Sequence, residues 1–61
     1  MKYRDARLLQ SGHEVIRKVD QMIITVTSIE AFGQYKKVKI AGTDSNGVKA
    51  YLFNEEVDAK G

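Results

Sequence analysis

The sequence predicts an all-β fold, a small barrel built from five short strands. Runs rich in β-branched and aromatic residues alternate with turn residues, which is typical of strands joined by short loops. The dipeptide Asn46-Gly47 lies between two such runs, Tyr35–Thr43 and Val48–Phe53, and indicates a hairpin. An open sheet of two or three strands would leave edges and apolar surface uncovered, so we expect the sheet to curl into a barrel.

The chain has 61 residues, and we expect residues 1–61 to form a single domain in which 1–4 and 59–61 are frayed. A domain of this size buries only about 60% of its unfolded surface, so its stability is marginal. The absence of cysteine and the single histidine, His13, exclude disulfides, thiolate sites and multi-histidine metal sites within the chain. We therefore expect no metal and no cofactor, and stability from a compact core or from a second copy.

Cysteine usage and hydropathy predict a soluble, cytoplasmic protein with no membrane partner. The lack of cysteine fits a reducing compartment. The residues Met1–Asp5 are charged and lack the apolar segment of a signal peptide. Apolar runs such as Met22–Ile24 are far too short to cross a bilayer.

Residues 1–12 allow two interpretations. Arg4–Gln10 could form one or two helical turns that end at Ser11-Gly12, but a helix this short is unstable in water by itself. Alternatively, Ala6–Leu9 is a short edge strand that leads into a turn. Because everything downstream reads as β structure, we favour the strand.

Side-chain patterns predict the next two strands. His13–Val19 reads as a strand whose residues alternate between two faces, and Asp20-Gln21 follows as a tight turn. Met22–Ile29 is the strongest strand, rich in isoleucine, valine and threonine. Ile29 has the opposite parity to the earlier apolar residues of its strand. One bulge near Thr27-Ser28 would return it to the core and bend the strand, as small barrels require.

Turn residues predict the later connections. Ala31–Gln34 reads as a connection in which Gly33 is suited to positive φ. Asn46-Gly47 suits a type I′ turn, because asparagine tolerates positive φ and glycine has no Cβ to clash. Asn54–Asp58 is either one turn of 3₁₀ helix or a short closing strand.

The length of the hairpin loop decides which side chains face the core. With a two-residue loop, Tyr51 and Phe53 face inward; with a three-residue loop and Gly47 in a bulge, the register slips by one. Ala50 and Leu52 then turn inward, and the two rings emerge beside the lysines of the neighbouring strand. We favour the two-residue loop, because it buries two rings in a domain short of core. The expected core residues are Val15, Ile24, Val26, Ile29, Val38, Ile40 and Phe53.

Two stretches carry a family pattern. Leu9–Val15 is a turn followed by a strand, and Thr25–Glu30 reads Thr-Val-Thr-Ser-Ile-Glu. The first is similar to the Gly-Asp-x-Val opening of small bacterial SH3-like barrel proteins, with His13 in place of the aspartate. The second resembles the Thr-Val-x-x-Ile segment of the same proteins, many of unknown function, and KOW-type domains of ribosomal and transcription proteins look related in outline. The resemblance covers roughly residues 8–57, implies a five-stranded SH3-like barrel and carries no catalytic residue across.

The sequence offers no pattern of catalytic or metal-binding residues. His13 and Glu14 are neighbours on a strand and point to opposite faces, which makes them a poor acid–base pair. The serines at positions 11, 28 and 45 have no evident base partner. The C-terminal carboxylates and the turn Asp44–Gly47 lack the ligand spacing of a calcium loop. We expect no catalytic residue and no enzyme activity.

The expected function is that of a non-catalytic binding module. A net charge of only +2 does not by itself require a nucleic-acid partner, but lysines gather around the hairpin. The residues that we expect to contact a partner are Tyr35, Lys37, Lys39 and Lys49.

Three kinds of partner fit such a module. A protein partner, bound by the barrel surface or by a free strand edge, ranks first. Nucleic acid ranks second, through lysines on phosphates and aromatic rings on bases. Self-association into a homo-oligomer ranks third. Lysines and an exposed ring on a single face would favour nucleic acid, whereas an exposed apolar patch or an open strand edge would favour protein.

Overall fold

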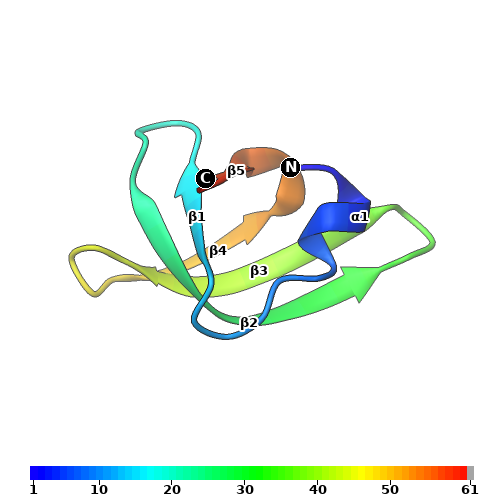
Figure 1. The fold of residues 1–61 in the computed structure, drawn as a ribbon, viewed down its shortest axis with the longest axis horizontal. Coiled ribbons are helices and arrows are strands. Elements are labelled where there is room, and N and C mark those ends of the chain that lie inside the picture. The colour runs from blue at the N-terminus through cyan, green and yellow to red at the C-terminus, as the bar shows by residue number, and fades with distance from the viewer. Residues whose placement is uncertain (61) are drawn as a thin grey trace.

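The computed structural model describes residues 1–60 as a small all-β domain (Figure 1). Its five strands form one antiparallel sheet in the order β4-β3-β2-β1-β5, which confirms the all-β prediction. In chain order the elements are α1 (Tyr3–Ala6), β1 (Glu14–Arg17), β2 (Ile23–Phe32), β3 (Lys37–Asp44), β4 (Lys49–Phe53), the 3₁₀ turn η1 (Asn54–Glu56) and β5 (Val57–Ala59).

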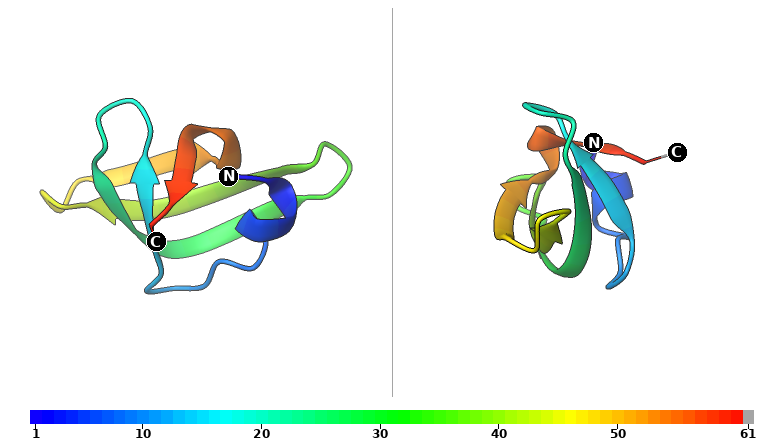
Figure 2. Two further views of the ribbon diagram at one scale, coloured as in Figure 1. Left: turned by 45° about the horizontal axis from the view of Figure 1, so that its top comes forward. Right: turned by 90° about the vertical axis from the view of Figure 1, so that its left-hand side faces the viewer.

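The sheet curls without closing. Figure 2 shows it nearly end-on as a strongly curved layer, with β1 and β5 turned across the part formed by β3 and β4. Within residues 1–60 no ladder joins β4 to β5, so these two strands are the edges of the sheet. The expected closure into a barrel is therefore not reached through strand pairing.

A bulge in β2 produces the bend that the sequence predicts. Val26 pairs with Gly42 and Ser28 pairs with Ala41, so Thr27 is the extra residue. The Thr27 hydroxyl donates a hydrogen bond to the Ala41 carbonyl at 3.0 Å. After the bulge Ile29 packs against the core, as its parity required.

The core lies inside the curl of the sheet. Five of the seven residues expected there are fully buried, and Ile29 is partly buried. Phe53 was wrongly placed in the core, because its side chain is 40% exposed. The buried apolar residues are Ala6, Val15, Ile24, Val26, Val38, Ile40, Ala50 and Val57.

The hairpin explains the error at Phe53. Ile40 pairs with Leu52, so the loop has three residues and the favoured two-residue register is wrong. Asp44 holds this loop: its Oδ1 accepts hydrogen bonds from the backbone N–H groups of Asn46 at 2.8 Å and Val48 at 3.0 Å. Gly47 has a φ of 80°, as expected, whereas Asn46 does not have positive φ, which excludes a type I′ turn.

The N-terminal segment forms a helix, so the favoured edge strand is wrong there. Ala6 is fully buried in the core, and this packing stabilises a helix too short to persist alone. Figures 1 and 2 place α1 beside the end of the β2–β3 hairpin, where Lys36 Nζ lies 5.7 Å from the centre of the Tyr3 ring.

The turns after β1 and β2 both differ in position from the sequence prediction. A turn is present at Asp20-Gln21, with Gln21 at a φ of 59°, but it begins earlier than expected: β1 ends at Arg17, so Lys18 and Val19 belong to the turn and not to the strand. The next connection lies later than expected, because the β2–β3 ladder continues to the pair Phe32 and Lys37. Positive φ therefore falls on Lys36, at 54°, and not on Gly33.

The C-terminal segment contains both of the structures considered for it, the 3₁₀ turn η1 and the closing strand β5. Asn54 anchors η1. Its buried Oδ1 accepts a hydrogen bond from the Val38 N–H at 2.9 Å, and its Nδ2 donates to the Met1 carbonyl at 2.9 Å. Of the residues expected to fray, Gly61 lies outside the described range.

Candidate nucleic-acid interface

The outer face of β2, β3 and β4 carries aromatic and basic side chains, together with one carboxylate, Glu30, directly opposite Lys39. Alternate residues of a strand point to the same side, so Lys37 and Lys39 of β3 share this face. The register places Phe32 opposite Lys37 and Phe53 opposite Lys39. We call this surface the aromatic–basic face, and its residues are Phe32, Tyr35, Lys37, Lys39, Lys49, Tyr51 and Phe53.

Two lysines lie diagonally over exposed rings of the neighbouring strand. Lys37 Nζ is 5.3 Å from the centre of the Phe53 ring, and Lys39 Nζ is 5.9 Å from the centre of the Tyr51 ring. Exposed cation–π contacts of this kind are worth about 0.5–1 kcal/mol. The flexible lysine stems can therefore swing toward a stronger anionic partner and leave the rings free.

Open hollows follow one another along this face. One of about 310 Å³ is lined by Phe32, Tyr35, Lys37 and Phe53. Two others, of about 270 Å³ and 260 Å³, share the small residues Ser28 and Ala41 and the ring of Tyr51. Small side chains between large rings thus leave space for flat groups to lie against the sheet.

The lysines of the face differ in their charge partners. The Lys37 ammonium forms an ion pair with the Glu55 carboxylate, and its hydrogen bond and charge lower the pKa of Glu55. Within residues 1–60 neither Lys39 nor Lys49 has a carboxylate within ion-pair distance. Glu30 lies across the ladder from Lys39 but forms no ion pair with it, so both ammonium groups are available to an anionic ligand.

The structure brings the four expected contact residues to one surface. Lys37, Lys39 and Lys49 lie on neighbouring strands, and Tyr35, which is 67% exposed, lines the hollow beside Lys37. The sequence assigned Phe53 to the core and so missed it here. The residue that could have corrected this is Asp44, whose carboxylate is suited to holding a three-residue loop.

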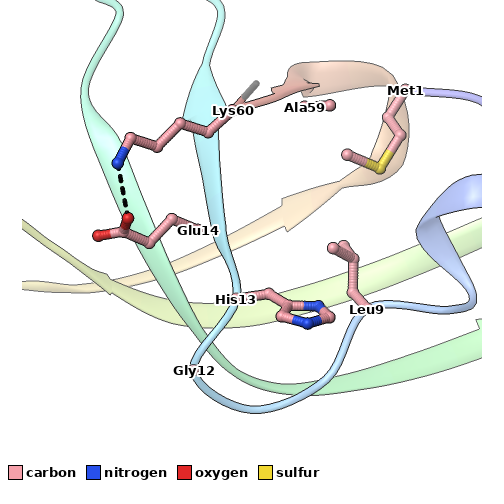
Figure 3. Close-up of a pocket in the computed structure, with 7 residues that line it drawn as sticks. All are labelled: Met1, Leu9, Gly12, His13, Glu14, Ala59 and Lys60. Atoms are coloured by element: carbon pink, nitrogen blue, oxygen red, sulfur yellow. Dashed lines mark hydrogen bonds and ion pairs between the residues drawn. The ribbon is translucent and has the colours of Figure 1, made fainter.

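Another hollow, of about 560 Å³, lies away from this face beside β1 and is lined in part by His13 (Figure 3). His13 Nδ1 accepts a hydrogen bond from the Gln10 N–H at 3.1 Å. Glu14 turns away from the imidazole and pairs with Lys60 at 2.7 Å, as the figure shows. The histidine and the carboxylate are therefore not arranged as an acid–base pair, as their adjacent positions on the strand suggested.

Among residues 1–60, no cluster of three or more histidine, cysteine, aspartate or glutamate side chains is arranged to hold a metal ion. None of the helices in this range is long and apolar enough to cross a membrane.

No protein-family model matches the chain, and neither a curated protein nor a solved structure is significantly similar to it.

Proposed function

We propose that this protein is a non-catalytic binding module that takes single-stranded nucleic acid on its aromatic–basic face. The observation that carries the proposal is that lysines and exposed rings share one surface. Tyr51 is 64% exposed and Phe53 is 40% exposed, and each lies against a lysine of β3. Rings of this kind stack on bases, and lysines neutralise phosphates.

The spacing of the two rings supports an unpaired strand as the ligand. Tyr51 and Phe53 are two residues apart on β4, which separates them by about 6.7 Å along the strand. Sheet surfaces with neighbouring aromatic side chains are a known way to hold two or three unpaired bases of RNA. A duplex hides the faces of its bases, so stacking on these rings requires a single strand.

We further propose that the curled sheet is an SH3-like barrel in which closure is completed by side-chain packing. The strand order, the bend in β2 and the 3₁₀ turn between β4 and β5 support this assignment. It agrees with the resemblance of Leu9–Val15 and Thr25–Glu30 to that class.

A protein partner is the second candidate, and the free edge of β4 favours it. In an antiparallel ladder, hydrogen-bonded pairs of residues alternate with pairs that are not hydrogen-bonded. The hydrogen bond from the Asp44 N–H to the Val48 carbonyl shows that Asp44 and Val48 are a hydrogen-bonded pair. Lys49 and Tyr51 therefore direct their backbone N–H and C=O groups away from β3, where an added strand could pair with them. We rank nucleic acid first because the exposed apolar groups here are rings interleaved with lysines rather than an aliphatic patch.

A chemical-shift titration tests the proposal. The isotopically labelled protein is titrated at low salt with an oligodeoxythymidylate of about ten nucleotides, a length within the site sizes of single-strand binding domains. We expect the shift changes to concentrate on β3, β4 and the turn at Tyr35. Lys39→Ala should weaken binding, whereas Lys60→Ala, which removes the same charge beside β1, should change it little. Shift changes centred on another surface would reject this face, and absence of binding would favour a protein partner.

A further inference from the structure

One lysine of the aromatic–basic face already holds an anion. Lys37 is the only lysine of that face paired with a carboxylate within residues 1–60. Its partner Glu55 lies in η1, directly after β4. The same ammonium lies 5.3 Å from the centre of the Phe53 ring. An oxyanion, a cation and an exposed ring are thus in contact at one end of the face.

A hollow adjoins this ion pair. It has a volume of about 310 Å³, and its walls are the rings of Phe32, Tyr35 and Phe53 together with Lys37. This volume is at the small end of the range for ligand sites. Apart from Lys37 and the Tyr35 hydroxyl its lining side chains are apolar, so a flat ring can lie against its walls, but few groups are present to read the edge of a base.

We infer that Lys37 is a phosphate subsite, occupied by the Glu55 carboxylate in the free protein, and that the hollow beside it takes the base of the same nucleotide. This inference rests on the proposed function, since it adds a subsite to the same face. The ligand is one nucleotide of a single strand, held by its phosphate and by stacking of its base.

The exchange of anions is chemically balanced. Carboxylate and phosphate oxygens both accept charge-assisted hydrogen bonds from an ammonium group. The Lys37 and Glu55 side chains are 43% and 63% exposed, so water screens their attraction and the pair is easily opened. When a phosphate binds, the Glu55 carboxylate returns to water and recruits a counterion. Glu55 therefore lowers the affinity for nucleic acid. Because the hollow is lined mainly by apolar rings, the subsite should accept different bases equally well.

Substitution of Glu55 tests the inference. The affinity for an oligodeoxythymidylate of about ten nucleotides is measured for the unmodified protein and for Glu55→Gln. On a single strand, the logarithm of the binding constant falls with the logarithm of the salt concentration by about 0.7 for each phosphate that the protein neutralises. At about 50 mM salt, one additional neutralised phosphate therefore raises the affinity roughly eightfold. We expect a gain approaching that value and a salt slope steeper by about 0.7. Asp58→Asn is the control, because it removes one negative charge whose partner, Lys18, lies outside the face.

A second background separates the subsite from general electrostatics. When Lys37 is already replaced by alanine, Glu55→Gln should raise the affinity for the oligonucleotide only as little as Asp58→Asn does. The reason is that the Lys37 ammonium, which loss of the Glu55 carboxylate would otherwise free, is absent. Bound oligonucleotide should also return the lowered pKa of Glu55 toward its ordinary value, as followed by the carboxyl carbon shift. If the unmodified protein binds but Glu55→Gln equals Asp58→Asn, the subsite is rejected and the proposed function stands. If no variant binds, both are rejected.

Discussion

Replacing Asn54 with alanine should destabilise the domain far more than replacing an exposed asparagine. Asn54 is only 4% exposed, and its side-chain oxygen is the acceptor for the buried N–H of Val38. Leaving that N–H without a partner costs about 1–3 kcal/mol. Loss of the hydrogen bond to the Met1 carbonyl adds about 0.5–1.5 kcal/mol.

The expected loss, about 1.5–4.5 kcal/mol, is large for so small a domain. At about 0.05–0.15 kcal/mol per residue, the whole chain is stable by only about 3–9 kcal/mol. Urea unfolding measures the change. With a slope of about 1 kcal/mol per molar urea, the midpoint should fall by about 1.5 M or more, unless the variant is already unfolded.

The control is Asn46→Ala. Asn46 is exposed, and only its backbone N–H takes part in the hydrogen bond to Asp44. Its substitution should cost less than about 0.5 kcal/mol. Equal, small losses for the two variants would show that Asn54 does not anchor η1 to β3. That result would also remove the explanation of how the residues before and after Asn54, Phe53 and Glu55, are held close to Lys37.

Three further predictions concern the hairpin and its neighbours. Ile40→Ala should cost about 2–5 kcal/mol in urea unfolding, and Phe53→Ala should cost much less, because Ile40 is fully buried and Phe53 is 40% exposed; a reversed order would restore the two-residue loop. Gly47→Val should lower the melting temperature far more than Ser45→Ala, because Gly47 has a φ of 80°; similar small shifts would contradict this loop. The pKa of Glu55 is lowered by the hydrogen bond and charge of its lysine partner, so its stabilisation is present above the unfolded-state pKa and is lost as the pH falls through the folded-state pKa. Urea midpoints followed from about pH 6 to about pH 3 should therefore fall less in Glu55→Gln than in the unmodified protein, and parallel curves would count against this ion pair.

Local rules predicted the strands well. The bulge at Thr27 followed from the parity of Ile29, because only an extra residue brings that side chain to the core face. The positive φ of Gly47 followed from turn chemistry. The helix at Tyr3–Ala6 did not follow, since its stability comes from burial of Ala6 against strands far along the chain.

Whether Tyr51 and Phe53 belong to the candidate site depends on a one-residue difference in the register of β3 and β4. Asn-Gly is compatible with loops of two and three residues, and the Asp44 side chain stabilises the longer one. That choice moves Tyr51 and Phe53 from the core to the surface beside the lysines. The ion pair between Lys37 and Glu55 joins residues 18 positions apart and depends on where η1 begins, which local patterns do not specify.

The salt dependence of oligodeoxythymidylate binding tests the central claim most directly, when measured for the unmodified protein, Lys39→Ala and Tyr51→Ala. Lys39→Ala should reduce the salt slope by about 0.7, because one phosphate contact is lost. Tyr51→Ala should lower the affinity about 5- to 150-fold with little change in slope, because a stacked base is worth about 1–3 kcal/mol. A slope that stays the same in Lys39→Ala, or a Tyr51→Ala protein that binds as tightly as the unmodified one, would contradict nucleic-acid binding by this face.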